Sequence, residues 1–536
     1  MPLPLRPMHC LATLTALMSA LPTAHAAWPD TPPTLIVTGQ KDEKPGHWIK
    51  AEAVNVIVYA TDERQARETA ARLERFHQVL TLLTRSSPHP DSRAIPVYLV
   101  RSRNEIGRLR RQGMTPGSFP TGYYSASPTG MLLAADLEWD LLYPRTPSVS
   151  DVWLFEEYTR HFIARNEQSG NLPDWYVTGF ALVMATMQFH KDRIDYGLGH
   201  PDLVRRLQSA RWEPMEHIIG GRLEHGQMYS AQAMLLVHYI LARPDRQAAF
   251  KRFIAALHRG QPPIPAFEQT FNTTMATLQT SLQDYRGRAG HTGATLTGFT
   301  TPEVFVSRLP LSADTLMLDD AAMRIGIPEE DRQRAVLQRA RNAYDGTHDH
   351  FAARALIRAQ LLYGEPALAD PALDRLMAAR PRDAELLYLK GLRHLMAGTR
   401  GAPSLAPDEW RKAQQWLIQA HHLDEDDYAI LYAWVASLGA DPQFLSDNAL
   451  NALLRAAYLA PQATQIRISA TLMMMAREQF DDAIALLSSI TATPRDPAST
   501  QVPALLEQAR AHRKPDLAAI IASFRYTATW RDLNCC

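Results

Sequence analysis

The sequence is poor in cysteine and has no excess of either charge. Its 536 residues include three cysteines, none in a C-x-x-C pair, which excludes a disulfide framework and a thiolate zinc site. Lysine plus arginine number 56, as do aspartate plus glutamate, so the basic footprint of a nucleic-acid-binding protein is absent. Glycine and proline are too sparse for a collagen-like or disordered chain. We therefore expect a conventionally packed protein of two or three domains that binds no nucleic acid.

Long apolar runs are also missing, except near the N-terminus. There Arg6 precedes the apolar run 11–21, and the small-residue triplet 24–26 stands before Ala27. This order is typical of a secretory signal peptide, and the run is too short for a stable membrane anchor. The sequence predicts a signal peptide over residues 1–26, cleavage after Ala26, a periplasmic or secreted product, and no membrane span once the signal is removed.

The next part of the chain alternates between strand-like and helix-like patterns. A lead-in over residues 27–47, rich in proline and threonine, is expected to be extended, with one strand near 35–38. The pattern after it predicts a small mixed sheet with helices on one face, the first half of a domain spanning residues 48–290. Its expected elements are a strand at 54–60, a helix with apolar positions from Ala66 to Leu83, a strand at 95–100, a helix at 104–112 and a hairpin at 122–135.

The chain turns helical after Pro147. Residues 291–344, with clustered threonine, glycine and proline, are expected to form a connector. The periodicity before them predicts four helices that complete the first domain, at 148–165, 173–190, 228–242 and 245–258.

A spacing of alanine, leucine and a small or apolar residue repeats beyond residue 345. Prolines stand twelve residues after the first alanine in two copies, at Pro381 and Pro461, where each would end a helix. Residues 345–495 therefore resemble the tetratricopeptide repeat family, which implies an all-α solenoid with a concave surface for protein partners. Residues 496–536 are expected to be C-terminal helices and a tail. The four copies are Ala369-Leu373-Leu376, Ala413-Leu417-Ala420, Ala449-Leu453-Ala456 and Ala483-Leu487-Ile490.

Two short motifs in the first domain carry the functional argument. Residues 154–162 read LFEEYTRHF, and residues 172–181 read LPDWYVTGFA. From about Trp48 to Gly290 the chain resembles the peptidase-MA-like family of gluzincin metallopeptidases, whose corresponding motifs are LFHEYTHHF and P-x-W-Y-V-E-G-F-A. The resemblance implies an α+β gluzincin-like domain. In the family, two histidines and a glutamate bind zinc, and the glutamate of HExxH activates the metal-bound water.

The ligand positions of that motif differ in this chain. By position, the first histidine falls on Glu156, the catalytic glutamate on Glu157, the second histidine on Arg160 and the third ligand on Thr178. A guanidinium has no lone pair to offer a metal and stays protonated. The resemblance therefore implies a degenerate zinc site with no metal and no other cofactor, in which Glu157 has nothing to activate. No P-loop, G-x-G-x-x-G or G-x-S-x-G motif is present.

The spacing leaves two interpretations of the altered site open. Glu156 and Arg160 are four residues apart with the acid first, the better orientation for a helical ion pair. In one interpretation an ion pair or hydrogen bond fills the former metal site, with Thr178 in reach of it. In the other it is a surface pair that stabilises the fold by at most ~0.5 kcal/mol.

A metal site shifted along the same helix is a further possibility. Glu157 and His161 are also four residues apart and would be one carboxylate and one imidazole ligand. The remaining ligand would come from one of four histidines, each of which is more often a surface or capping residue: His190, His200, His217 and His225.

The sequence as a whole predicts a non-catalytic exported protein that binds peptides or proteins through the former cleft, the repeat groove or both. The expected cleft-edge strand contains Met131, Leu132 and Leu133, because metallopeptidases of this shape hold substrates by adding a strand to such an edge. His161 and Tyr229 are further cleft candidates, although core packing explains Tyr229 equally well.

Two alternatives remain at this stage. One is an active metallopeptidase with an unorthodox metal site that uses Glu157. The other is a solenoid adaptor or scaffold whose first domain is inert. Cys535 and Cys536 end the chain, either as unpaired thiols or in an intermolecular disulfide.

Overall fold

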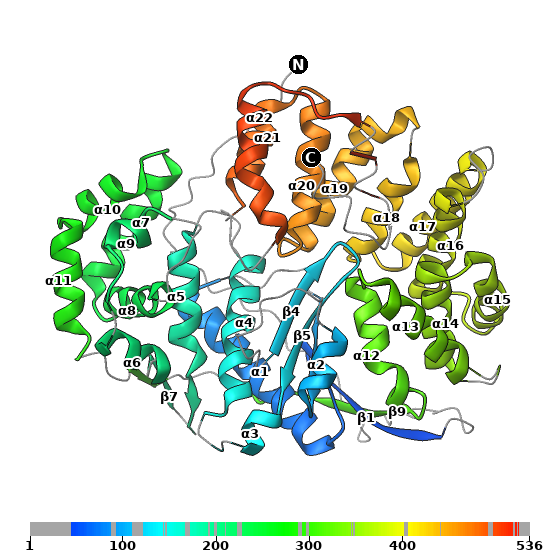
Figure 1. Ribbon diagram of the computed structural model, residues 1–536, viewed down its shortest axis with the longest axis horizontal. Coiled ribbons are helices and arrows are strands. Elements are labelled where there is room, and N and C mark those ends of the chain that lie inside the picture. The colour runs from blue at the N-terminus through cyan, green and yellow to red at the C-terminus, as the bar shows by residue number, and fades with distance from the viewer. Residues whose placement is uncertain are drawn as a thin grey trace, which may run out of the picture. The chain divides into compact units, whose positions relative to one another are not determined.

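The computed structural model describes most of the chain from Lys44 onward (Figure 1). Contacts divide the chain into residues 1–42 and one compact unit, residues 43–536. The predicted signal peptide, the strand expected near residue 35 and the C-terminal cysteines lie outside the described residues. The described residues are 44–86, 93–109, 122–142, 144, 147–166, 172–190, 193–197, 201–209, 211–221, 228–287, 292–295, 300–344, 346, 349–400, 406–439, 441–490, 497–517, 520, 521 and 524.

A six-stranded mixed sheet lies at the centre of the compact unit (Figure 1). The strand order is β4-β5-β3-β2-β1-β9, with β3 parallel to β2 and β5 and every other pair antiparallel. The first strand begins at Pro45, inside the stretch that was expected to be lead-in. The strands are β1 (Pro45–Glu52), β2 (Val56–Ala60), β3 (Ile95–Val100), β4 (Gly122–Ser127), β5 (Gly130–Asp136) and β9 (Phe305–Pro310).

Helices cover both faces of this sheet. Val97 and Leu99 of β3 pack in one apolar cluster with α1 and α4, whereas Tyr98 and Val100 pack in another with α2 and α12. The prediction of helices on one face is therefore wrong. Strands buried on both faces have near-continuous apolar runs, and the sequence of β3, IPVYLV, is one. The four helices are α1 (Glu63–Thr84), α2 (Arg103–Leu109), α4 (Val149–Asn166) and α12 (Ala313–Ile325).

The stretch expected to be a connector, residues 291–344, is mostly regular structure where it is described. It contributes β8 (Thr292–Thr295), the edge strand β9, the sheet-covering helix α12 and α13 (Glu330–Ala343). Leu316 and Ala321 of α12 are fully buried. The cluster of threonine, glycine and proline ends near Pro302, so the connector prediction extended a loop signal over an amphipathic helix.

A helical lobe follows the sheet strands. Its central helix α5 packs on α4 and α8, and a Cβ on Gly179 of α5 would collide with the carbonyl oxygen of Ala233 in α8. The helix predicted over 173–190 ends at Ala185, because the chain turns into the short strand β6. The remaining elements are α3 (Glu138–Leu142), α5 (Asp174–Ala185), β6 (Gln188–Phe189), β7 (Arg193–Tyr196), α6 (Pro201–Ser209), α7 (Met215–Ile219), α8 (Tyr229–Leu241), α9 (Pro244–His258), α10 (Pro263–Phe271) and α11 (Met275–Tyr285).

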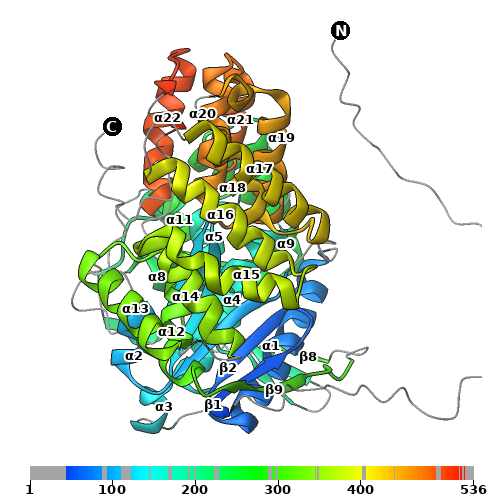
Figure 2. The same cartoon turned by 90° about the vertical axis from the view of Figure 1, so that its right-hand side faces the viewer.

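The C-terminal half is an array of helices, seen along one side of the sheet in Figure 2. The repeated alanines and leucines are buried, for example Ala413 and Leu417 in the middle of α17. A Cβ on Gly391 of α16 would lie 2.6 Å from Leu417 Cγ, so the glycine lets α16 approach α17. The array comprises α14 (His350–Tyr363), η1 (Pro366–Ala369), α15 (Asp370–Ala379), α16 (Ala384–Arg400), α17 (Ala406–Leu423), α18 (Tyr428–Leu438), η2 (Pro442–Leu445), α19 (Asp447–Leu459), α20 (Thr464–Ala476), α21 (Phe480–Ser488), η3 (Pro497–Gln501) and α22 (Val502–Arg510).

The sheet region and the helical array share a core. Tyr98 of β3, Leu316 of α12 and Ala355 of α14 belong to one apolar cluster. Helix α12 thus packs on the sheet on one side and on the array on the other. The architecture is α+β, as predicted, but its two halves are packed together within a single unit.

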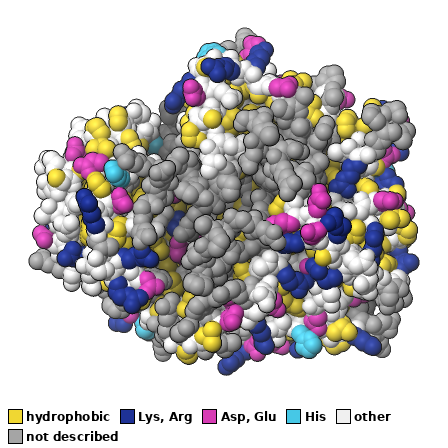
Figure 3. Space-filling view, in the orientation of Figure 1, with side chains coloured by type: hydrophobic (Ala, Val, Ile, Leu, Met, Phe, Trp, Pro, Cys, Tyr) yellow, Lys and Arg dark blue, Asp and Glu magenta, His cyan; other side chains and the backbone are white. Residues whose placement is uncertain are grey.

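The described surface carries charges of both signs. Figure 3 shows basic and acidic side chains interspersed over one face, in keeping with the zero net charge of the sequence. In the described part of the chain, no helix is long and apolar enough to cross a membrane.

Candidate functional site

Arg160 lies between three side chains that, like Arg160 itself, stand at motif positions of the gluzincin resemblance. Its Nη2 is 3.0 Å from Glu156 Oε1, its Nη1 donates to Thr178 Oγ1 at 3.2 Å, and its Nε is 3.7 Å from Glu157 Oε1. Helix α4 supplies the two acids and the arginine at three- and four-residue spacing, and α5 supplies the threonine. The predicted ion pair with Thr178 in reach is confirmed.

These side chains are also mostly buried. The exposed fractions are 13% for Arg160, 14% for Glu156 and 9% for Glu157. This burial favours an ion pair that fills the space between the two helices over a solvent-exposed surface pair. The Arg160 guanidinium, a permanent cation with three oxygen neighbours, occupies the space between α4 and α5. Its charge would repel a divalent metal ion there, and its atoms would leave the ion no room.

The described residues of the shifted metal site do not converge. Glu157 faces Arg160, whereas His190 pairs with Asp195 at 2.9 Å and His217 lies 3.5 Å from Glu213. His200 and His225 lie outside the described residues. Within the described ranges, no group of three or more histidine, cysteine, aspartate or glutamate side chains is arranged to hold a metal ion.

Tyr229 stands at the first turn of α8, close to the same region. Its hydroxyl donates to Asp174 Oδ2 at 2.7 Å, and the side chain is buried. Burial, together with the charge of Asp174, raises the pKa of Tyr229 far above its ordinary value. The tyrosine therefore joins α8 to the start of α5 as a neutral hydrogen-bond donor.

The expected cleft-edge strand is not an edge. β5 pairs with β3 on one side and with β4 on the other, so β4 is the outer strand. Leu132 and Leu133 are both buried, in the clusters on opposite faces of the sheet. Their placement in a cleft is wrong. Only Met131, at the tip of the hairpin, reaches a cavity.

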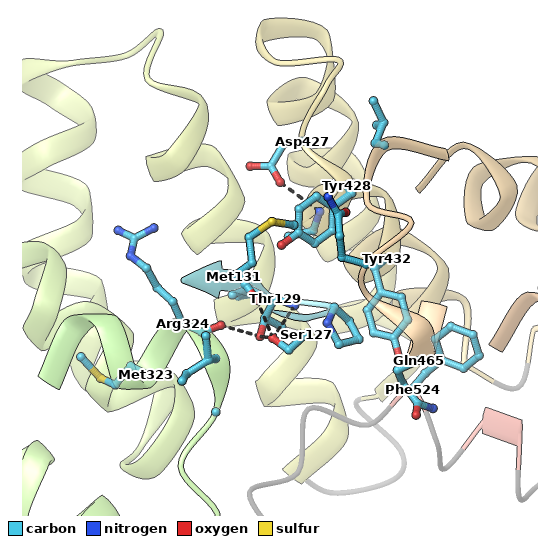
Figure 4. A pocket seen from close by; sticks show the side chains of 18 of the residues that line it. Ser127, Thr129, Met131, Met323, Arg324, Asp427, Tyr428, Tyr432, Gln465 and Phe524 are labelled. Atoms are coloured by element: carbon cyan, nitrogen blue, oxygen red, sulfur yellow. Dashed lines mark hydrogen bonds between the residues drawn. The ribbon is translucent and has the colours of Figure 1, made fainter. Parts of the chain in front are cut away.

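That cavity lies where the β4–β5 hairpin tip meets the helical array (Figure 4). Its volume is about 1040 Å³, close to the upper end for small-molecule pockets. The hairpin tip lies against α12, where Thr129 Oγ1 donates to the carbonyl oxygen of Arg324 at 2.7 Å. A Cβ on Gly130 would come within 2.8 Å of that same oxygen. The tip therefore needs glycine to fit against α12.

Aromatic side chains contribute to the cavity wall. Tyr388, Tyr428, Tyr432 and Phe524 all line it, and the rings of Tyr432 and Phe524 stack at 5.1 Å. In Figure 4, Met131 points from the hairpin toward Tyr428. Aromatic and methionine side chains offer a large apolar contact area with some polar capacity, which suits a bound organic molecule.

Several charged side chains of the wall form ion pairs. Arg93 bonds to Asp424 and lies 3.3 Å from Asp427, so it links the loop before β3 to the α17–α18 turn. Burial raises the pKa of Asp427 despite the opposing effect of Arg93. Arg358 pairs with Asp320 and, at 2.6 Å, with Glu385. The pairs of Arg93 and the pair Arg358–Asp320 cross from the sheet region to the array.

His161, like Met131, is a predicted cleft residue that lines the cavity. It is 2% exposed, and its Nδ1 lies 3.4 Å from both Tyr124 Oη and Gln462 Nε2. Burial, with the nearby Arg165 and His77, lowers the pKa of His161 well below its ordinary value, so the ring is neutral. The sequence placed His161 near the metal site, whereas it faces the array.

Sequence reasoning missed the array residues of this cavity. Residues 428–434, YAILYAW, form a helix that is apolar all round, which is a sign of a helix buried on every side. This pattern predicts a buried helix, but it does not indicate that the β4–β5 hairpin is the neighbour of that helix.

No family model, no curated protein and no solved structure matches this chain. Fold and site define its class as an α+β protein in which a mixed sheet and a helical array enclose an aromatic-lined cavity. Its function has to be inferred from its own residues.

Proposed function

We propose that this is a non-catalytic exported protein, derived from a gluzincin-like peptidase, that binds peptides in the cavity between the β4–β5 hairpin and a tetratricopeptide-like array. The observation that carries the loss of catalysis is the position of Arg160. A cation fixed by Glu156 and Thr178 stands where the resemblance places a zinc ligand. Without a metal-bound water, Glu157 has no proton to take in a hydrolytic step.

The cavity supports the binding role. The sequence offered the former cleft and the repeat groove as separate candidates, and the cavity is walled by residues from both regions. Its aromatic wall and its polar glutamines suit a peptide, which brings apolar side chains together with main-chain donors and acceptors. A folded protein partner would engage it through an extended segment.

Metal analysis tests the loss of catalysis. The mature protein, purified after overnight exposure to zinc and gel filtration, should contain no stoichiometric zinc and should cleave no peptide in a random tripeptide library. The triple substitution Glu156→His, Arg160→His and Thr178→Glu should create zinc affinity if the backbone is gluzincin-like. Stoichiometric zinc in the unmodified protein, with cleavage abolished by Glu157→Gln, would instead establish the metallopeptidase alternative.

A cavity-filling substitution tests the binding site. Leu472 of α20 lines the cavity, and Leu472→Trp should abolish retention of N-acetylated tripeptides in equilibrium dialysis. Leu368→Trp is the matched control, since Leu368 is 52% exposed and lies outside the cavity wall. Equal peptide retention by the two variants would place binding elsewhere on the protein.

A further inference from the structure

Arg165 lies in the cavity wall without an acidic partner among the described residues. It belongs to the last turn of α4 and is 7% exposed. Its Nη2 donates to the backbone carbonyl of Arg93 at 3.0 Å, and no described carboxylate lies within ion-pair distance. The other arginines of the wall, Arg93, Arg324 and Arg358, each pair with at least one carboxylate.

The surroundings of Arg165 do not offset its charge. The C-terminal end of a helix carries only about half a unit of negative charge. His77 and His161 are the histidines beside Arg165. Burial and then Arg165 lower the pKa of His77 to about 4, and the same two causes lower the pKa of His161. Both rings are therefore neutral. The nearby buried Glu74 is bonded to the backbone and side-chain nitrogens of Asn55, at 2.9 and 2.6 Å. A buried cation without a counter-charge favours an anion beside it.

Hydrogen-bonding atoms next to Arg165 are also left over. His161 is one helical turn before Arg165, and its Nδ1 faces Gln462 Nε2, an amide nitrogen that can only donate. The proton of the neutral ring therefore resides on Nε2, which is buried and has no partner in the described part of the chain. Oε1 of Gln462 and Oε1 of Gln465, also on wall residues, are buried and have no partner among the described residues either.

We propose that the cavity recognises a carboxylate of a bound peptide, paired with Arg165 and hydrogen-bonded by Nε2 of His161. Gln462 and Gln465 then accept hydrogen bonds from main-chain N–H groups of the same peptide, after small rotations of their amides. The aromatic wall packs on its apolar side chains. This inference rests on the proposed peptide-binding function and adds the chemical group by which the ligand is oriented.

Calorimetric titration of the mature protein with a matched pair of probes tests the proposal. The probes are N-acetyl-alanyl-leucyl-phenylalanine with a free carboxylate and the same tripeptide as its C-terminal amide. The free acid should bind at least tenfold more tightly than the amide. Arg165→Gln should remove this preference by weakening the acid alone, and Arg165→Lys should restore part of it, because it returns the charge without the planar fork.

Two controls separate a local effect from a general one. Arg334→Gln removes an equal charge from a side chain that is 69% exposed on α13, and it should leave the preference for the acid unchanged. A third probe, an amidated tripeptide with a central glutamate, identifies the source of the carboxylate. If this glutamate probe binds as tightly as the free acid, the recognised carboxylate belongs to a side chain. If it binds weakly, the recognised carboxylate is the C-terminal one. Both outcomes support the carboxylate site.

Three results would overturn the inference, and they differ in what they say about the proposed function. Equal binding of acid and amide, or an acid preference that persists in Arg165→Gln, removes the carboxylate site and leaves peptide binding intact. Failure of every probe to bind removes both. A thermal unfolding curve with an unchanged midpoint shows that each variant is folded.

Discussion

Arg358 is the side chain whose loss should destabilise the junction between sheet and array most clearly. It is 7% exposed and pairs with Asp320 of α12, which is 8% exposed, and with Glu385 of α16. Arg358→Met keeps the apolar stem of the side chain but removes its charge. Asp320 is then paired with Arg324, whose side chain is 42% exposed. Removing one partner of a buried pair typically costs about 3–5 kcal/mol. Because Arg324 offsets part of this, we expect the free energy of unfolding to fall by about 3 kcal/mol.

Urea denaturation at neutral pH, followed by circular dichroism, measures this change. The matched control is Arg334→Met, which removes an arginine paired with Glu330 and Asp331 at the surface and should cost less than about 0.5 kcal/mol. Adding Asp320→Leu to Arg358→Met should recover part of the loss, since no unpaired buried charge then remains. A change for Arg358→Met within error of the control would refute the view that these charges bind the two regions together.

The same variant has a signature in its pH dependence. Burial alone would raise the pKa of Asp320, but Arg324 and then Arg358 hold it below its usual value. Glu385 is shifted in the same direction, by Arg324, Arg358 and Arg354 against its burial. Carboxylates with a depressed pKa stabilise the fold above their unfolded-state pKa of about 4, and this stabilisation is lost as the pH falls below it. Arg358→Met should therefore show a shallower loss of stability between about pH 5 and pH 3.

Three further perturbations test other parts of the structure by the same unfolding assay. Gly179→Ala should cost about 1–3 kcal/mol by overpacking α5 against α8, whereas Gly287→Ala, where a Cβ meets nothing within 4 Å, should be within about 0.5 kcal/mol of the parent protein. The pKa of His77, lowered to about 4 by burial and then Arg165, predicts a loss of about 3 kcal/mol as the pH falls from 6.5 to 4, and His77→Phe should flatten that slope. Arg160→Met should cost about 2 kcal/mol, because two mostly buried carboxylates lose their cation; a cost below ~0.5 kcal/mol would restore the surface-pair interpretation.

Local sequence patterns predicted correctly those features that depend on a single helix. The apolar spacing from Ala66 to Leu83 predicted α1, and its positions as far as Leu80 are buried, whereas Leu83 is partly buried. The four-residue spacing of Glu156 and Arg160 predicted their ion pair, because two side chains one turn apart on a helix meet whatever surrounds them. The burial of that pair depended on α5, and spacing alone left it open.

Predictions failed where the partner came from a distant part of the chain. The hairpin predicted at 122–135 is present, but which of its strands pairs with β3 depends on the fold, and β5 rather than β4 is internal. The contact between His161 and Gln462 joins residues 301 positions apart. No local periodicity carries such information, so the cavity could not be predicted.

The close junction also decides how the adaptor hypothesis can be tested. If the array worked alone, deletion of residues 28–290 would leave binding intact, but that deletion would also expose the apolar positions of α14 that now pack with the sheet region. A loss of binding would then report unfolding as readily as a lost site. Arg165→Gln and Leu472→Trp avoid this ambiguity, because one alters the wall from the sheet region and the other alters it from the array. An array that binds alone predicts an effect of the second substitution only, whereas a shared cavity predicts an effect of both.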